Sequence, residues 1–274
     1  MFIVRSSPGF HKVANILTNV LGAAERSPDI CSNNPEAARA LNVQAAKALA
    51  ELTRERSIFL IYISTDYVFL GKPGDAPYES DAPPAPTNEY GQTKLDGENA
   101  VLEATKRTGL GVSLRVPVLY GSVENGKNSE SAVNTLMDVL WKAQEANASV
   151  KMDDWAQRYP TNTGDVGRVC KDIAEKYLKA PAADRSKLPT ILHFSSEDRL
   201  TKYQICEIFA EIMGLPVGGL VPSKEGNDPN AAAQRPYDTH LSTRGLKNLG
   251  IDVSTMDFKA WWLVKISLLS LTPY

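Results

Sequence analysis

The first half of the chain alternates between two hydrophobic patterns. Over residues 34–56, alanine and leucine recur every three or four positions, among them Ala38, Leu41 and Leu52. This spacing predicts an amphipathic helix. Residues 58–63 are apolar without interruption and rich in β-branched and aromatic types, as expected of a strand that is buried on both faces of a parallel sheet. A predicted helix is thus followed directly by a predicted strand.

The same alternation is repeated further along the chain. The polar residues Ser64, Thr65 and Asp66 end the strand, and a proline-rich loop leads to the next elements. These are a predicted helix over residues 87–108 and a predicted strand over residues 112–119. Helix, strand, helix, strand in this order predicts a doubly wound α/β fold with a parallel sheet.

Beyond Gly121 the pattern is less regular, and no internal repeat is found. We expect a helix over residues 132–144, a polar segment up to residue 158, a helix over 165–180, a strand over 190–194 and an amphipathic helix from Thr201. The helix and strand between residues 165 and 194 are expected to return to the sheet. The sequence therefore predicts two interleaved lobes, one of residues 1–121 and 162–196, the other of residues 122–161 and 197–274.

Composition and charge narrow the range of functions. The 274-residue chain carries 30 basic and 32 acidic side chains, and these are dispersed along the sequence. Without a basic patch, nucleic acid and anionic lipid are not expected as partners. No apolar run is long enough for a signal peptide or a membrane span, so we expect a cytoplasmic protein. The three cysteines and three histidines are scattered, which indicates a reducing compartment and no metal site.

Tyr90 and Lys94 form the most informative pair in the chain. Four residues apart on a helix, their side chains lie on one face, so that an ammonium can stabilise an ionised phenol. Ser64 and Thr65 come at the carboxyl end of a predicted strand, where open α/β sheets place their ligands. A proton donor, a cation and an orienting hydroxyl are the groups that hydride-transfer chemistry requires. Taken alone, however, this spacing is common, and an exposed helix pair is the simpler alternative.

Several segments resemble the dTDP-4-dehydrorhamnose reductase-like family of the extended short-chain dehydrogenase/reductase superfamily. They are residues 23–26, 61–69, 90–98 and 114–121. The resemblance extends over most of residues 20–252. Within this family, residues 23–29, 155–161 and 233–236 look more like the branch of regulatory β subunits of methionine adenosyltransferase than like bacterial sugar-nucleotide reductases.

The family resemblance implies a Rossmann-like core with a smaller substrate-binding lobe. It implies that Thr65, Tyr90 and Lys94 occupy the catalytic triad positions, with Tyr90 as proton donor. Lys94 would hydrogen-bond the cofactor ribose and lower the pKa of the tyrosine. The residues that it places at an NADP(H) site, with NAD as the alternative, are Gly22, Arg26, Ser64, Tyr90, Lys94 and Leu119.

The resemblance to the β-subunit branch implies a role other than catalysis. It suggests a nucleotide-binding subunit that associates with the catalytic subunit of methionine adenosyltransferase and modulates S-adenosylmethionine biosynthesis. The intact triad supports an alternative, an NADPH-dependent reductase of a nucleotide-linked 4-keto sugar. A third alternative is a fragment without function.

Both ends of the chain depart from the family pattern. Family members begin with a strand, a glycine-rich turn and a helix that hold the pyrophosphate, and residues 1–19 resemble no such segment. We therefore expect the Rossmann-like core to lack its first βα units, on the order of 60 residues, and NADP binding to be weakened. Residues 261–274 differ from the family tail that is implicated in docking the catalytic subunit.

Overall fold

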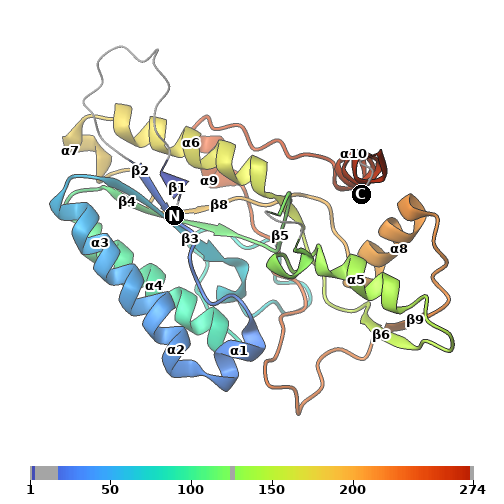
Figure 1. The fold of residues 1–274 in the computed structure, drawn as a ribbon. Helices are drawn as coiled ribbons and strands as arrows, with labels where there is room; N and C mark the ends of the chain where they lie inside the picture. Colours follow the sequence, from blue (N-terminus) through green and yellow to red (C-terminus); the bar gives the residue numbers. More distant parts are fainter. Residues whose placement is uncertain (1, 4–17, 124–126, 272–274) are drawn as a thin grey trace.

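A five-stranded sheet forms the centre of the computed structural model, which describes residues 2–3, 18–123 and 127–271 (Figure 1). The strand order is β1–β2–β3–β4–β8. The strands are β1 Phe2–Ile3, β2 Thr18–Leu21, β3 Phe59–Thr65, β4 Gly111–Val116 and β8 Ile191–His193. All neighbours are parallel except β1, which runs antiparallel to β2. The predicted doubly wound α/β core with a parallel sheet is confirmed.

Strand β3 is central because it is apolar along most of its length. It pairs with β2 on one side and β4 on the other, so that Ile61 lies between Val20 and Val112. Its residues are buried on both faces of the sheet, as the uninterrupted apolar run predicts. The strand is longer than expected, since it includes Ser64 and Thr65.

One face of the sheet is covered by the helices between residues 28 and 105 (Figure 1). They are α1 Pro28–Asn33, α2 Pro35–Arg39, a π-helical segment Ala40–Ala45, α3 Ala46–Glu55 and α4 Glu89–Thr105. The predicted helix over residues 34–56 is confirmed, but its buried face is not the expected one. Leu41 and Leu52 are 42% and 46% exposed, whereas Asn42 is 1% exposed. The π-helical turn changes the rotation of the helix, and the spacing of apolar residues does not reveal it.

The opposite face is covered by α6 Thr163–Lys179, α7 Ala182–Arg185 and α9 Arg244–Asn248 (Figure 1). Val169 and Ile173 of α6 pack against the sheet in the largest hydrophobic cluster, which also includes Leu246 of α9. The helix predicted over residues 165–180 and the strand predicted over 190–194 are confirmed within two residues at each end.

A second hydrophobic cluster lies beside the main sheet and surrounds Trp262 and Phe209. Its helices are α5 Thr135–Lys142, α8 Lys202–Met213 and α10 Phe258–Leu271. Two short parallel pairs accompany them, β5 Leu119–Tyr120 with β7 Thr161–Asn162 and β6 Val150–Asp153 with β9 Leu220–Ser223. The strand predicted over residues 112–119 ends early, at Val116, and the polar segment predicted up to residue 158 contains β6.

We propose that this second cluster marks the smaller of the two predicted lobes. Helix α9 lies within residues 197–274, and its Leu246 packs in the first hydrophobic cluster. Residues 4–17 and 124–126, which the lobe prediction includes, lie outside the described residues.

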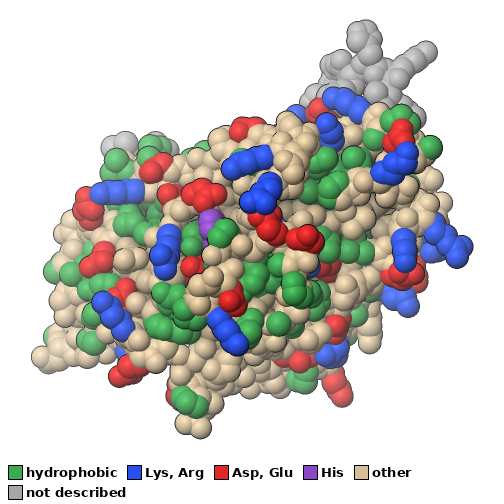
Figure 2. Space-filling model, turned by 180° about the vertical axis from the view of Figure 1, so that it is seen from behind, with side chains coloured by type: hydrophobic (Ala, Val, Ile, Leu, Met, Phe, Trp, Pro, Cys, Tyr) green, Lys and Arg blue, Asp and Glu red, His purple; other side chains and the backbone are tan. Residues whose placement is uncertain are grey.

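Charged side chains of both signs are interspersed on the face shown in Figure 2, with small apolar patches between them. In the described ranges, no helix has the length and apolar character needed to span a membrane.

Candidate functional site

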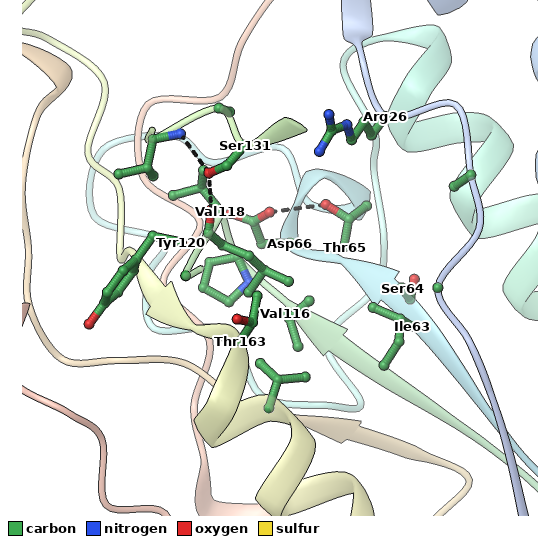
Figure 3. A pocket seen from close by; sticks show the side chains of 18 of the residues that line it. Arg26, Ile63, Ser64, Thr65, Asp66, Val116, Val118, Tyr120, Ser131 and Thr163 are labelled. Carbon is green, nitrogen blue, oxygen red and sulfur yellow. Dashed lines mark hydrogen bonds between the residues drawn. The ribbon is translucent and has the colours of Figure 1, made fainter. Parts of the chain in front are cut away.

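A cleft of about 2050 Å³ opens at the carboxyl ends of β2, β3 and β4. It is bounded on the far side by residues of the second cluster, including Leu136 of α5 and Ile205 of α8. Figure 3 shows Ser64 and Thr65 at the end of β3, Val116 at the end of β4, and Arg26 on the loop that follows β2. The residues of the predicted site that line this cleft are Gly22, Arg26, Ser64, Thr65, Tyr90, Lys94 and Leu119. The structure thus brings all of them together.

The end of β3 presents two hydroxyl groups with different surroundings. Thr65 Oγ1 donates to Asp66 Oδ1 at 3.1 Å and accepts from the Tyr67 backbone N–H at 3.2 Å, which caps a short 3₁₀ turn, Asp66–Val68. Burial raises the pKa of Asp66, and a hydrogen bond from Thr239 Oγ1 (2.6 Å) opposes this shift. Ser64 Oγ is buried and has no partner within the described ranges. Its unsatisfied hydroxyl is therefore free to bind a ligand.

Tyr90 lies in the first turn of α4, and its position is set by the start of that helix. Asn88 is the N-cap, and its Oδ1 accepts from the Gly91 backbone N–H at 2.9 Å. Gly91 allows a close approach, because a Cβ at this position would lie 2.2 Å from the Tyr67 carbonyl oxygen. The Tyr67 ring contacts the Tyr90 ring edge-on, with centroids 5.7 Å apart.

Lys94 is held by β3 rather than by the phenol of Tyr90. Its Nζ donates to the Ile63 carbonyl oxygen at 2.7 Å and lies 4.1 Å from the centre of the Tyr62 ring. Burial lowers the pKa of Lys94 to about 7, although the Glu98 carboxylate acts in the opposite direction.

The pKa of Tyr90 contradicts the sequence expectation. Burial raises the pKa of Tyr90 above its ordinary value, and a hydrogen bond with Thr65 only partly opposes this. We had expected the ammonium of Lys94 to lower it. The reason for the difference is desolvation, which disfavours the phenolate in this wall of the cleft.

A buried ion pair fixes the orientation of α4 against the sheet. Arg115 of β4 donates to both carboxylate oxygens of Glu98, with Nη2 to Oε1 at 2.6 Å and Nε to Oε2 at 3.1 Å. Ser113 Oγ donates to Oε2 at 2.8 Å, and Arg115 Nη1 lies 3.3 Å from His193 Nε2. Bidentate pairing of this kind is geometrically specific, so it helps to place Tyr90 and Lys94.

Asn42 supports the site in a way that the sequence analysis missed. Its Oδ1 accepts from the Glu25 backbone N–H at 2.8 Å, and its Nδ2 donates to the Glu25 carbonyl oxygen and to Thr93 Oγ1, both at 3.0 Å. The side chain therefore ties the loop after β2 to α4. The sequence contained one signal for this role: Asn42 is a polar residue four positions after the apolar Ala38, which places it on the same face of the predicted helix.

The cleft also contains cationic residues that the sequence analysis did not assign. Arg158, Lys202 and Arg235 line it together with the predicted Arg26. Arg26 Nη2 donates to the Ser129 carbonyl oxygen at 3.0 Å, and Nη1 donates to that of Glu130. Across the part of the chain that the structure covers, no group of three or more His, Cys, Asp or Glu side chains could hold a metal ion.

A known family matches most of the chain. Residues 12–260 match the family described as RmlD substrate binding domain. The match includes residues 12–19, which we had expected to resemble no family segment.

Two similar curated proteins share one name. Methionine adenosyltransferase 2 subunit beta of Pongo abelii is 43% identical over 234 residues, which cover 85% of this chain and 65% of that protein. The Danio rerio protein of the same name is 41% identical over 237 residues, 86% of this chain and 68% of that protein. The chain thus spans about two thirds of the length of these relatives.

Among solved structures, the dTDP-4-dehydrorhamnose reductase of Bacillus anthracis, determined in complex with NADP, superposes with a TM-score of 0.70 at 22% identity. The superposition covers 92% of this chain and 79% of that one, and it supports the Rossmann-like fold. With the family match and the sequence identities, it leads to one conclusion: the chain belongs to the RmlD substrate binding domain family and is similar, within that family, to the β subunits of methionine adenosyltransferase 2.

Proposed function

We propose that the chain is a regulatory subunit of methionine adenosyltransferase that binds NADP and acts in S-adenosylmethionine biosynthesis. The observation that carries this proposal is the identity of 41–43%, over 85% of the chain or more, with proteins named as the β subunit of that enzyme. A subunit requires a partner, so the proposal includes association with the catalytic subunit.

The cofactor part of the proposal rests on the end of the cleft near β3. Among the described residues, Ser64 Oγ is buried without a hydrogen-bond partner, and a Cβ placed at Gly22 would meet no atom within 4 Å. Tyr90, Lys94 and Thr65 would hold the nicotinamide and its ribose, and Leu119 would pack against them. A bound nicotinamide would supply hydride-transfer chemistry. NADP is favoured by the related reductase that was solved with it, and NAD is the alternative.

The pyrophosphate part of the site fits less well. The turn after β2 contains a single glycine, Gly22, and among the described turns that follow strands of the main sheet none has the repeated glycines of a dinucleotide fingerprint. The described residues therefore fit the nicotinamide and ribose better than the pyrophosphate. We expect an affinity for NADP below that of a complete Rossmann site.

A cytoplasmic location is part of the same proposal. Cys31, Cys170 and Cys206 are all buried and unpaired, which is usual in a reducing compartment.

Association and cofactor binding can be tested separately. The tagged chain should retain the methionine adenosyltransferase catalytic subunit in reciprocal pull-downs and change its rate of S-adenosylmethionine synthesis. In calorimetric titrations, Lys94→Met should weaken NADP binding, because this substitution removes the cation beside the ribose. Lys106→Met, at the exposed end of the same helix, should not. Absence of association in both directions would refute the regulatory role.

An NADPH-dependent reductase of a nucleotide-linked 4-keto sugar is the second candidate. It is favoured by the convergence of Thr65, Tyr90 and Lys94 in one cleft. The raised pKa of Tyr90 weighs against it, since an efficient proton donor has a pKa close to the working pH. The assay is NADPH consumption with dTDP-4-dehydrorhamnose, which the Tyr90→Phe variant should abolish. A folded chain that consumes no NADPH would eliminate this candidate.

A further inference from the structure

Residues 224–236 form a long loop after β9, the β9 loop. Part of this loop is closed on itself by one side chain. Asn227 Oδ1 accepts from the Arg235 backbone N–H at 2.9 Å, and Asn227 Nδ2 donates to the Arg235 carbonyl oxygen at 2.7 Å. These two hydrogen bonds hold the ends of residues 227–235 together, so we expect this part of the chain to move as one body. Compact surface loops whose ends lie close together are frequently functional.

Two adjacent residues of the β9 loop contact helices that cover the main sheet. Arg235 Nη2 lies 2.6 Å from Oδ2 of Asp29, in the first turn of α1. The Gln234 carbonyl oxygen accepts from Nδ2 of Asn88, the N-cap of α4, at 2.7 Å. Asp29 and Arg235 both line the cleft, so their ion pair joins the β9 loop to the main core at the edge of the cleft.

The β9 loop has a point at each end about which it can turn. Gly226 has a φ of +76°, a conformation that side chains other than glycine rarely adopt. At the other end, the Tyr237 backbone N–H donates to the Gly71 carbonyl oxygen at 3.0 Å. Between Gly226 and Tyr237, a stretch that the structure describes throughout, the chain forms no helix or strand, and only Ala233 and Pro236 are buried. Little apolar burial therefore holds the loop in place.

The contacts that hold the β9 loop are weak. The side chain of Asp29 is 49% exposed and that of Arg235 is 28% exposed. Solvent and salt weaken the attraction, so an ion pair of this kind contributes little to stability. The neutral hydrogen bond from Asn88 also has a modest net contribution. These contacts can therefore break and re-form while the rest of the chain stays folded.

We propose that the β9 loop is a flap at the edge of the cleft, that the Arg235–Asp29 ion pair holds it shut, and that its opening admits a ligand. The pair closes the cleft whether or not a ligand is inside. It therefore sets the rates of entry and exit and leaves the affinity unchanged. The rate measurements rest on the proposed function, because NADP is the ligand used.

Stopped-flow mixing of the whole chain with NADP measures the rate constants of entry and exit. Arg235→Gln should raise both by the same factor, about twofold to fivefold, because it removes a partly exposed ion pair. The Kd should stay the same. Asp29→Asn and the double variant should show the same increase, since all three lack one and the same interaction. As a matched control, Arg244→Gln removes an ion pair with Glu79 outside the cleft and should change neither rate constant.

The two single variants separate a flap from simpler electrostatic effects. Arg235→Gln removes a positive charge and Asp29→Asn a negative one, so attraction of the anionic NADP would change their entry rates in opposite directions. Opposite changes would overturn the flap. A higher Kd with a faster exit in Arg235→Gln alone would show instead that Arg235 binds the ligand directly.

Hydrogen exchange of the ligand-free chain, followed by mass spectrometry, makes the result independent of the cofactor proposal. The backbone amides of residues 227–235 should exchange about twofold to fivefold faster in Arg235→Gln and in Asp29→Asn than in the wild type or in Arg244→Gln. Equal exchange in all four proteins would overturn the flap. If NADP does not bind but exchange increases as expected, the cofactor proposal fails and the flap stands.

Discussion

Asn42→Ala should loosen the loop that follows β2 and weaken the binding of any ligand held against it. Asn42 is 1% exposed, and its amide makes two hydrogen bonds to the backbone of Glu25 and one to Thr93. Gly22, Glu25 and Arg26 all line the cleft, so the loop that Asn42 holds is part of the candidate site. The substitution removes the only side chain of the π-helical segment that is buried.

The expected cost follows from the three hydrogen bonds. Each contributes about 1 kcal/mol to stability, so that their loss costs about 3 kcal/mol. The two backbone groups of Glu25 lose a partner as well, which makes this a lower bound unless water replaces the amide. For a chain of this size, 1 kcal/mol corresponds to about 2–4 °C, and Tm should fall by about 6–12 °C.

Thermal unfolding followed by circular dichroism measures the stability effect, and an NADP titration well below Tm measures the effect on the site. Asn248→Ala is a matched control, because Asn248 is an exposed residue at the end of α9 and its loss should change the stability by less than about 0.5 kcal/mol. If Asn42→Ala and Asn248→Ala had the same Tm, Asn42 would not support the loop in the way that we infer.

Two further predictions concern the buried charges around α4. Glu98→Gln leaves the buried guanidinium of Arg115 without its counterion, so the free energy of unfolding measured in urea should fall by about 3–5 kcal/mol. A fall of less than about 1 kcal/mol would contradict the proposed role of the pair. The pKa of Lys94 is about 7 in the folded chain and 10.5, its ordinary value, in the unfolded chain. Between these two pH values the unfolded chain binds one more proton, so the stability of the wild type should rise with pH across this window. The measurement is the urea midpoint at pH 7 and at pH 10. The Lys94→Met variant should lack this rise, and an equal rise in the variant and the wild type would show that Lys94 is not its source.

The sequence by itself determined the order of the main elements and the place of the candidate site. Uninterrupted apolar runs and helical spacing record how each segment is buried, so β3, α4 and α6 could be predicted from their own residues. The convergence of Ser64, Thr65, Tyr90 and Lys94 also followed, because the carboxyl ends of parallel strands share one edge of the sheet.

Only the tertiary structure decided the features that depend on distant segments. Strand β6 forms because it pairs with β9, about 70 residues later, and its own sequence is too polar to predict it. The raised pKa of Tyr90 and the contact of Lys94 with Ile63 arise from burial, which no local spacing encodes. The position of Arg158 and Lys202 in the lining of one cleft has the same origin, since residues from separate segments reach a common site only when the chain is folded.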